Sequence, residues 1–154
     1  MKNNENEITT VFKSITINRI SQGIQYLHKN LLVHQDLQPS NILIDNDFNA
    51  YISKLETIRE VNQTDPNSCF TNNIGSPLYI SPEQSRCEKL SINTDIFSFG
   101  LIIYYVFEKE HLIKINNLAS TKPEEIIKNK PEMKNSSNSI QEICNKSIQI
   151  NTDE

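Results

Sequence analysis

The chain contains only three glycines among its 154 residues, and they stand far apart, at Gly23, Gly75 and Gly100. A loop that wraps a phosphate needs several glycines close together, because its backbone must approach the anion without side chains in between. The glycine positions therefore exclude a phosphate loop of the Walker or dinucleotide type within this chain. Most folds that bind a nucleotide by themselves are excluded with it.

With 36% hydrophobic and 22% charged residues, a chain of this length is expected to form one globular domain. Its net charge of -4 argues against nucleic acid or an anionic membrane as the partner and favours protein partners.

The cysteines are odd in number and far apart, at Cys69, Cys87 and Cys144. This pattern predicts free thiols in a reducing, cytoplasmic location. No signal peptide is visible, and the longest apolar run, Leu101–Phe107, is too short to span a membrane.

Two helices are predicted from the pattern of apolar residues. Between Ile17 and Leu27 these residues recur at helical spacing, which predicts an amphipathic helix over about residues 14–28. A strongly apolar segment predicts a buried helix from Asp95 to about Glu108, with Thr94 as its N-terminal cap. We expect this second helix to be the centre of the core.

Short strands are predicted between these helices. Apolar runs indicate strands at Leu31–Val33, Ile42–Ile44 and Ala50–Ser53. The turn residues of Asp45–Asn49 predict that the second and third strands pair as a hairpin. From Lys54 to Ser76 the periodicity disappears, and this stretch is predicted to be a mobile surface segment.

Two capping boxes predict shorter helices near the end of the chain. They are formed by Thr121 with Glu124 and by Ser139 with Glu142. The fold class expected from all these elements is mainly α with a small β-hairpin.

Three segments resemble motifs of the protein kinase family, in the order of that family. His34–Asn41, with the sequence HQDLQPSN, resembles the catalytic loop and follows Tyr26-Leu27-His28. Gly75–Glu83, which ends in Ser-Pro-Glu, resembles the end of an activation segment. Asp95–Gly100, with the sequence DIFSFG, resembles the start of the central buried helix of the family. The resemblance covers about Ile15 to Ile148.

The resemblance implies the large C-terminal lobe of a protein kinase, an α+β unit. We expect this partial domain to cover residues 14–150, between a polar N-terminal segment, residues 1–13, and a tail, residues 151–154. Only Met1–Lys13 precede the first predicted helix, so the small N-terminal lobe is expected to be absent.

The resemblance also implies roles for individual residues. Asp36 would be the base that accepts the proton of the substrate hydroxyl, and Asn41 would be a ligand of magnesium. The hydroxyl of Ser76 is expected to form a hydrogen bond with the catalytic loop. Further anchors of the activation segment and core would be His34, Ser76, Tyr79, Glu83 and Asp95.

The chain departs from the family pattern at the positions that carry charge. Counting from Asn41 through the hairpin places the Asp-Phe-Gly motif of the family on Lys54-Leu55-Glu56, so a cation replaces the metal ligand. Lys54 is instead predicted to contact a phosphate. Asp47-Phe48-Asn49 resembles the lost motif but is interpreted as the hairpin turn.

Two positive charges of the family pattern are also missing from the catalytic loop. Gln38 replaces the lysine that would face the transferred phosphate, and Gln35 replaces the arginine that would pair with a phosphorylated activation segment.

Glu83 is expected to lack its family partner, because the arginine that pairs with it would lie beyond Glu154. A buried carboxylate without a partner would lower stability.

These observations lead to one preferred hypothesis and two alternatives. The preferred one is a pseudokinase-type binding or regulatory module, impaired in phosphoryl transfer, that needs no cofactor as this chain alone. Its partner would be a protein, either a kinase or the missing small lobe. The first alternative is part of an active ATP- and magnesium-dependent kinase, of the Ser/Thr branch because Pro39 is present, completed by a small lobe elsewhere. The second is a truncated gene product without a stable fold.

Overall fold

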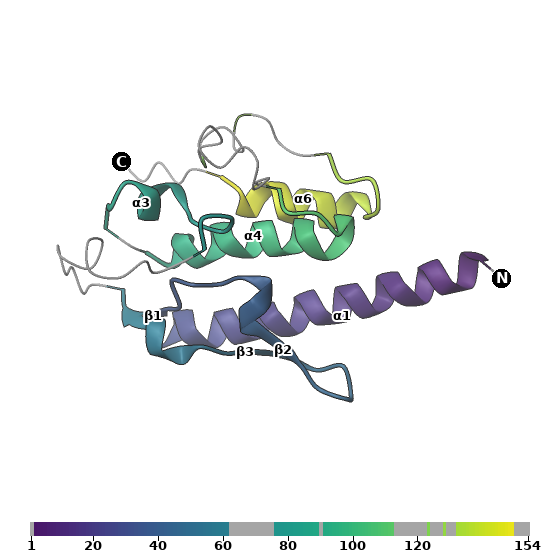
Figure 1. The fold of residues 1–154 in the computed structure, drawn as a ribbon, viewed down its shortest axis with the longest axis horizontal. Coiled ribbons are helices and arrows are strands. Elements are labelled where there is room, and N and C mark those ends of the chain that lie inside the picture. The colour runs from purple at the N-terminus through teal and green to yellow at the C-terminus, as the bar shows by residue number, and fades with distance from the viewer. Residues whose placement is uncertain are drawn as a thin grey trace.

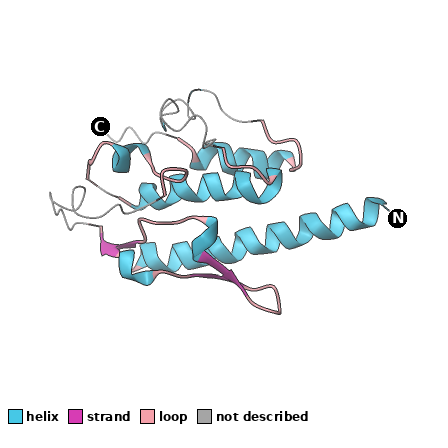
Figure 2. Ribbon diagram, viewed as in Figure 1, coloured by secondary structure: helices cyan, strands magenta, loops and turns pink. Residues whose placement is uncertain are grey.

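The structure is a computed structural model that describes residues 2–61, 76–89, 91–112, 123, 128 and 132–149 (Figures 1 and 2). The helices are α1 (Lys2–Lys29), α3 (Pro82–Ser85), α4 (Ile92–Glu108) and α6 (Asn138–Ser147), with 3-10 turns η1 (Pro39–Asn41) and η2 (Leu55–Thr57). The strands are β1 (Leu32–Val33), β2 (Ile42–Ile44), β3 (Ala50–Ile52) and β4 (Arg59–Glu60). The predicted class, mainly α with a small hairpin, is confirmed for the described residues. No helix among them is long and apolar enough to span a membrane.

The elements form layers around α1 and α4. Figure 1 shows α4 running beside α1, with α6 on the far side of α4 and the β2–β3 hairpin on the other side of α1. The core lies between these layers, because α1 contacts α4, β1 and β3, and α4 also contacts α6 and β1. Its buried apolar residues include Ile20, Ile24, Leu37, Phe97, Leu101, Ile102, Ile103, Phe107, Cys144 and Ile148.

Helix α1 ends where the sequence predicts but begins earlier. Residues 2–13, expected as a polar segment ahead of the helix, belong to it. Two tertiary contacts hold this part in place: the rings of Phe12 and Phe48 lie 4.9 Å apart, and Lys13 Nζ donates to the Phe107 carbonyl at 3.0 Å. The sequence pattern missed this extension because the contacts join distant segments and leave no apolar periodicity.

The predicted hairpin is confirmed. Strands β2 and β3 pair antiparallel, with Leu43 opposite Tyr51. The carboxylate of Asp45 accepts hydrogen bonds from the backbone N–H groups of Asp47 and Asn49 and from the Tyr51 hydroxyl. The hydrogen bonds from Asn49 are the main reason that the pKa of Asp45 is lowered. The segment 47–49 is therefore a turn, as interpreted, and not a displaced metal-binding motif.

The prediction of a mobile surface segment from Lys54 to Ser76 is partly wrong. Residues 55–57 form η2, and β4 pairs antiparallel with β1, Leu32 opposite Glu60 and Val33 opposite Arg59. A pair of strands only two residues long has too few positions to show an alternating pattern in the sequence. The rest of the predicted mobile segment, residues 62–75, lies outside the described residues.

Helix α4 is the predicted buried helix, but its cap is Ser91 and not Thr94. The Ser91 hydroxyl accepts from Asn93 N, and the Thr94 hydroxyl accepts from Ser91 N, so Thr94 is the inner partner of a capping box. Gly100 lies where α6 crosses α4. A Cβ there would lie 2.6 Å from Ile148 Cγ1, so glycine permits the close approach of the two helices.

Helix α6 also begins earlier than predicted. Ser137 caps it by accepting from Ile140 N, and Ser139 is already inside the helix. Glu142, the predicted partner in a capping box, forms an ion pair with Lys146 instead. The other predicted box, Thr121 with Glu124, lies outside the described residues.

Candidate functional site

The loop that follows β1 is fixed to α4 through one buried carboxylate. Asp95 Oδ2 accepts from His34 N at 2.8 Å and lies 3.0 Å from His28 Nε2, and Oδ1 accepts from Gln35 N at 3.0 Å. The Asp95 side chain is fully buried. Asp95 therefore holds the backbone of this loop against α4, and His28 contacts the same carboxylate.

The next two residues of the loop are also held tightly. His34 is buried, and its Nε2 lies 2.7 Å from the Ser53 carbonyl, which ties the loop to the end of the hairpin. Gln35 has a left-handed backbone with a φ of 69°, which is unfavourable for a residue other than glycine. Its carbonyl accepts from Gln84 Nε2 at 2.7 Å, so α3 stabilises this conformation. Sequence reasoning missed Gln84, since nothing in the sequence links it to Gln35.

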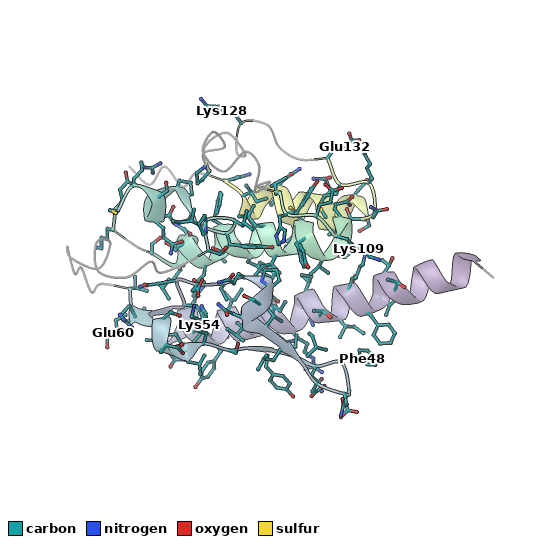
Figure 3. All side chains as sticks on the ribbon, viewed as in Figure 1. Phe48, Lys54, Glu60, Lys109, Lys128 and Glu132 are labelled. Atoms are coloured by element: carbon teal, nitrogen blue, oxygen red, sulfur yellow. The ribbon has the colours of Figure 1, made fainter. Side chains whose placement is uncertain are left out.

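The carboxylate of Asp36 is surrounded by hydrogen-bond donors from this chain. Gln38 Nε2 donates to Oδ1 at 2.7 Å, Asn41 Nδ2 donates to Oδ2 at 3.0 Å, and Lys54 Nζ pairs with Oδ2. The Asp36 side chain is only 1% exposed, whereas that of Lys54 is 42% exposed. The predicted pair Asp36 and Asn41 is brought together, and Lys54 joins it from the segment after the hairpin. Figure 3 labels Lys54 in this segment.

Lys54 reaches this position because the chain turns sharply there. Its backbone is left-handed, with a φ of 61°, and it immediately precedes η2. The hydrogen bond to Asp36, and then the charge of Asp36, raise the pKa of Lys54 above its usual value. Lys54 is therefore a protonated ammonium at neutral pH.

This set of groups does not fit magnesium. The ion prefers oxygen ligands in octahedral geometry, and here the position expected to supply a carboxylate ligand beside Asn41 carries the ammonium of Lys54, which is paired with Asp36. The amide nitrogen of Asn41 faces the same carboxylate and also donates to the Asp36 carbonyl at 2.7 Å. Within the described ranges, no group of three or more His, Cys, Asp and Glu residues could hold a metal.

Ser76 does not form the predicted contact among the described residues, whereas Tyr79 is buried against α4. The Ser76 hydroxyl accepts from Leu78 N at 3.4 Å within its own turn, and a bond to the catalytic loop is not among its contacts in the described part of the chain. Tyr79 is a buried anchor, since its hydroxyl lies 2.8 Å from His111 Nδ1 and its carbonyl accepts from the Ser98 hydroxyl at 2.8 Å. Burial raises the pKa of Tyr79.

Glu83 accepts a hydrogen bond, although the arginine of the family is not among its partners in the described residues. The Thr94 hydroxyl donates to Glu83 Oε1 at 2.9 Å, and the glutamate is only partly buried. Thr94 thus connects α3 to α4, and a neutral hydroxyl bonds one oxygen of the carboxylate that an arginine contacts in the family.

Comparison with known proteins identifies similar sequences. The profile of the family described as "Protein kinase domain" matches residues 3–154. The chain is 33% identical over 85 residues to the chicken (Gallus gallus) "Inhibitor of nuclear factor kappa-B kinase subunit alpha". It is 31% identical over 96 residues to "Cysteine-rich receptor-like protein kinase 45" of Arabidopsis thaliana, and 33% identical over 87 residues to a receptor protein kinase of Oryza sativa subsp. japonica.

These similarities cover much of this chain but little of the relatives. The match to the chicken protein covers 55% of this chain and 11% of that protein. The match to the Arabidopsis protein covers 60% of this chain and 27% of that protein, and the match to the rice protein covers 54% and 9%.

Proposed function

The chain belongs to the protein kinase family, and we propose that it is a large-lobe portion of a kinase domain that acts as a pseudokinase-type binding or regulatory module. In this proposal it is impaired in phosphoryl transfer. Membership of the family implies ATP and magnesium for an active member.

The observation that carries the proposal is the ion pair between Lys54 and Asp36. A general base is more effective the less its lone pairs are engaged, and three donors, from Gln38, Asn41 and Lys54, already occupy three of the about four lone-pair sites of the Asp36 carboxylate. The ammonium also repels a divalent cation. A metal ion supplies several kcal/mol of charge stabilisation in the transition state, so its loss alone would slow transfer roughly a thousandfold.

The neighbouring residues support the same conclusion. Gln38 uses its amide to bond Asp36, where the family has a lysine that faces the transferred phosphate. Gln35 is buried and carries no charge to receive a phosphorylated activation segment. Lys54 remains partly exposed, and within this proposal it contacts a phosphate group as a point charge, without magnesium.

A kinase assay of the purified chain tests this proposal. Radiolabelled ATP, magnesium and a generic protein substrate are incubated with the wild type and with Asp36→Ala. We expect no incorporation above background that depends on Asp36. Phosphorylation by the wild type that Asp36→Ala abolishes would contradict the proposal.

A second candidate is part of an active Ser/Thr kinase completed by a small lobe in another polypeptide. The observation that favours it is the position of Asp36 beside Asn41 on a loop held by Asp95. Under this candidate, adding a partner small lobe restores phosphorylation that depends on Asp36. If the chain instead has no stable fold, which is the second alternative, thermal unfolding will show no cooperative transition.

In the preferred proposal the partner is a protein, either an active kinase or a small lobe. A pull-down at physiological salt that recovers no specific protein would argue against this part of the proposal.

A further inference from the structure

A pocket of about 550 Å³ lies between α1 and β3. Its walls come from one face of α1, from the four consecutive residues Asn49–Ile52 and from Leu55, and no residue of β2 lines it. Leu27 and Ile52 provide apolar walls, while Tyr26 and Tyr51 are exposed at its rim. The volume is in the range of pockets that bind ligands, and the site is separate from the Asp36 centre.

The edge of β3 opposite β2 has backbone groups without a strand partner in the part of the chain that the structure describes. At the two ends of the β2–β3 ladder, Ser53 N donates to the Asn41 carbonyl and Asp45 N donates to the Asn49 carbonyl. Hydrogen-bonded pairs alternate along an antiparallel ladder, so the pair Leu43 and Tyr51 is bonded as well.

The residues between these pairs therefore direct their N–H and C=O groups away from β2. These are Ala50 and Ile52, both of which line the pocket. In the described part of the chain no third strand pairs with β3. Such an edge can accept an extended peptide as an additional strand.

One charge in the pocket indicates the chemistry of the occupant. Arg19 is exposed on the α1 wall and forms no ion pair within the described residues. The carboxylate of Asp45 on the hairpin accepts hydrogen bonds from Asn49 and Tyr51 and is not an ion-pair partner of Arg19 in the described part of the chain. A carboxylate brought by a partner would complete the pocket.

We propose that the α1–β3 pocket binds an extended, acidic peptide segment of a partner protein. The segment adds to β3 as a strand through Ala50 and Ile52, places an aliphatic side chain between Leu27 and Ile52, and pairs a carboxylate with Arg19. This proposal does not depend on the state of the Asp36 centre, because none of these residues contacts it.

Selection from a phage-displayed library of random dodecapeptides on the purified full chain tests this site. We expect enrichment of peptides that combine an acidic residue with aliphatic residues at alternate positions. An enriched peptide is then synthesised with a fluorescent label, and its affinity is measured by fluorescence polarisation. Arg19→Glu is expected to weaken binding about tenfold or more, because attraction becomes repulsion.

Two controls separate this site from unspecific binding. Lys29→Glu makes the same charge change on α1 outside the pocket and should leave the affinity within about twofold, as expected of a distant exposed charge. A copy of the peptide that is N-methylated at every residue of its central segment has no N–H group to donate to the β3 edge and should not bind. Asp36→Ala should bind the peptide like the wild type, whatever the kinase assay shows.

Several results would overturn the proposal. They are a selection that enriches no acidic peptide, equal affinity for Arg19→Glu that is correctly folded by circular dichroism, or undiminished binding of the N-methylated peptide.

Discussion

At the scale of single residues, the chemistry of the centre depends on the sign of the charge at position 54. Lys54→Asp replaces the ammonium by a carboxylate beside Asp36 and Asn41, which gives oxygen ligands of the kind that divalent cations prefer. We expect Mn²⁺ or Mg²⁺ to raise the unfolding temperature of this variant in a saturable way, because the ion binds only the folded state. The wild type should not respond.

Lys54→Met is the matched control for this experiment. It removes the cation without supplying a ligand, so its unfolding temperature should not depend on the metal. A rise for the wild type or for Lys54→Met equal to that of Lys54→Asp would show that Lys54 does not exclude the ion.

Asp95 is the residue whose loss should destabilise the fold most directly. Its buried carboxylate accepts from the backbone of His34 and Gln35 and contacts His28, and an amide cannot accept at both oxygen positions. Asp95→Asn should therefore lower the free energy of unfolding by roughly 2–4 kcal/mol. Urea unfolding measures this. The exposed Asp47→Asn should change stability by less than about 0.5 kcal/mol, and equal effects of the two would contradict the anchoring role.

How far single residues could be predicted depends on whether their partners are close in sequence. The positions of Asp36 and Asn41 follow from one continuous motif, and counting along the hairpin placed Lys54 at the metal-ligand position. The bonds that decide what these positions do could not be predicted. Thr94 donates to Glu83, and Gln84 holds the Gln35 carbonyl, only because α3 packs against α4 and the loop.

At the scale of elements, two serines near the start of α6 distinguish the observed cap from the predicted one. Ser137 accepts from Ile140 N, whereas Ser139 lies exposed in the first turn. Ser137→Ala should lower the free energy of unfolding by about 1 kcal/mol, and Ser139→Ala should change it by less than about 0.5 kcal/mol. Chemical unfolding of both variants gives the comparison. A larger loss of unfolding free energy in Ser139→Ala than in Ser137→Ala would place the cap at Ser139.

The two helical glycines at close contacts should respond differently to the same substitution. In Gly100→Ala the new Cβ meets Ile148 Cγ1 at 2.6 Å and Ser147 Cβ at 2.9 Å, so α4 and α6 must separate. We expect a loss of about 1–3 kcal/mol. In Gly23→Ala the Cβ meets the mobile end of the Ile52 side chain at 2.9 Å, and higher helix propensity offsets the strain.

Gly23→Ala should therefore remain within about 1 kcal/mol of the wild type. Thermal unfolding, followed by circular dichroism, ranks the two variants. Equal losses would mean that α6 does not approach α4 as closely as Gly100 permits.

Elements were predictable where local chemistry determines them. The turn residues of Asp45–Asn49 were enough to predict the β2–β3 hairpin, and the apolar run of α4 was enough to predict a buried helix. Their ends were less predictable, because several hydroxyl residues near each helix start could be the cap. The first turns of α1 and the β1–β4 pair depend on tertiary contacts, such as Phe12 with Phe48, that have no local signature.

At the scale of the whole molecule, the packing of α6 and the segment around Tyr79 against α4 links stability to alkaline pH. Burial raises the pKa of the Cys144 thiol from 9.0 to about 12 and also raises that of Tyr79. In the unfolded chain both groups ionise at their ordinary values, while in the folded chain they keep their protons. The unfolded state therefore binds fewer protons above about pH 9, and stability falls as the pH rises.

The expected slope is about 1.4 kcal/mol per pH unit for each such group between its two pKa values. The raised pKa of Lys54 also makes stability fall as the pH rises, whereas the lowered pKa of Lys13 weakly opposes this fall. Urea unfolding under reducing conditions between about pH 8 and pH 10.5 measures the slope. In Cys144→Ala the slope should be shallower even though the variant is less stable throughout, whereas the exposed Cys87→Ser should keep the wild-type slope. An unchanged slope in Cys144→Ala would mean that the thiol is not buried between α4 and α6.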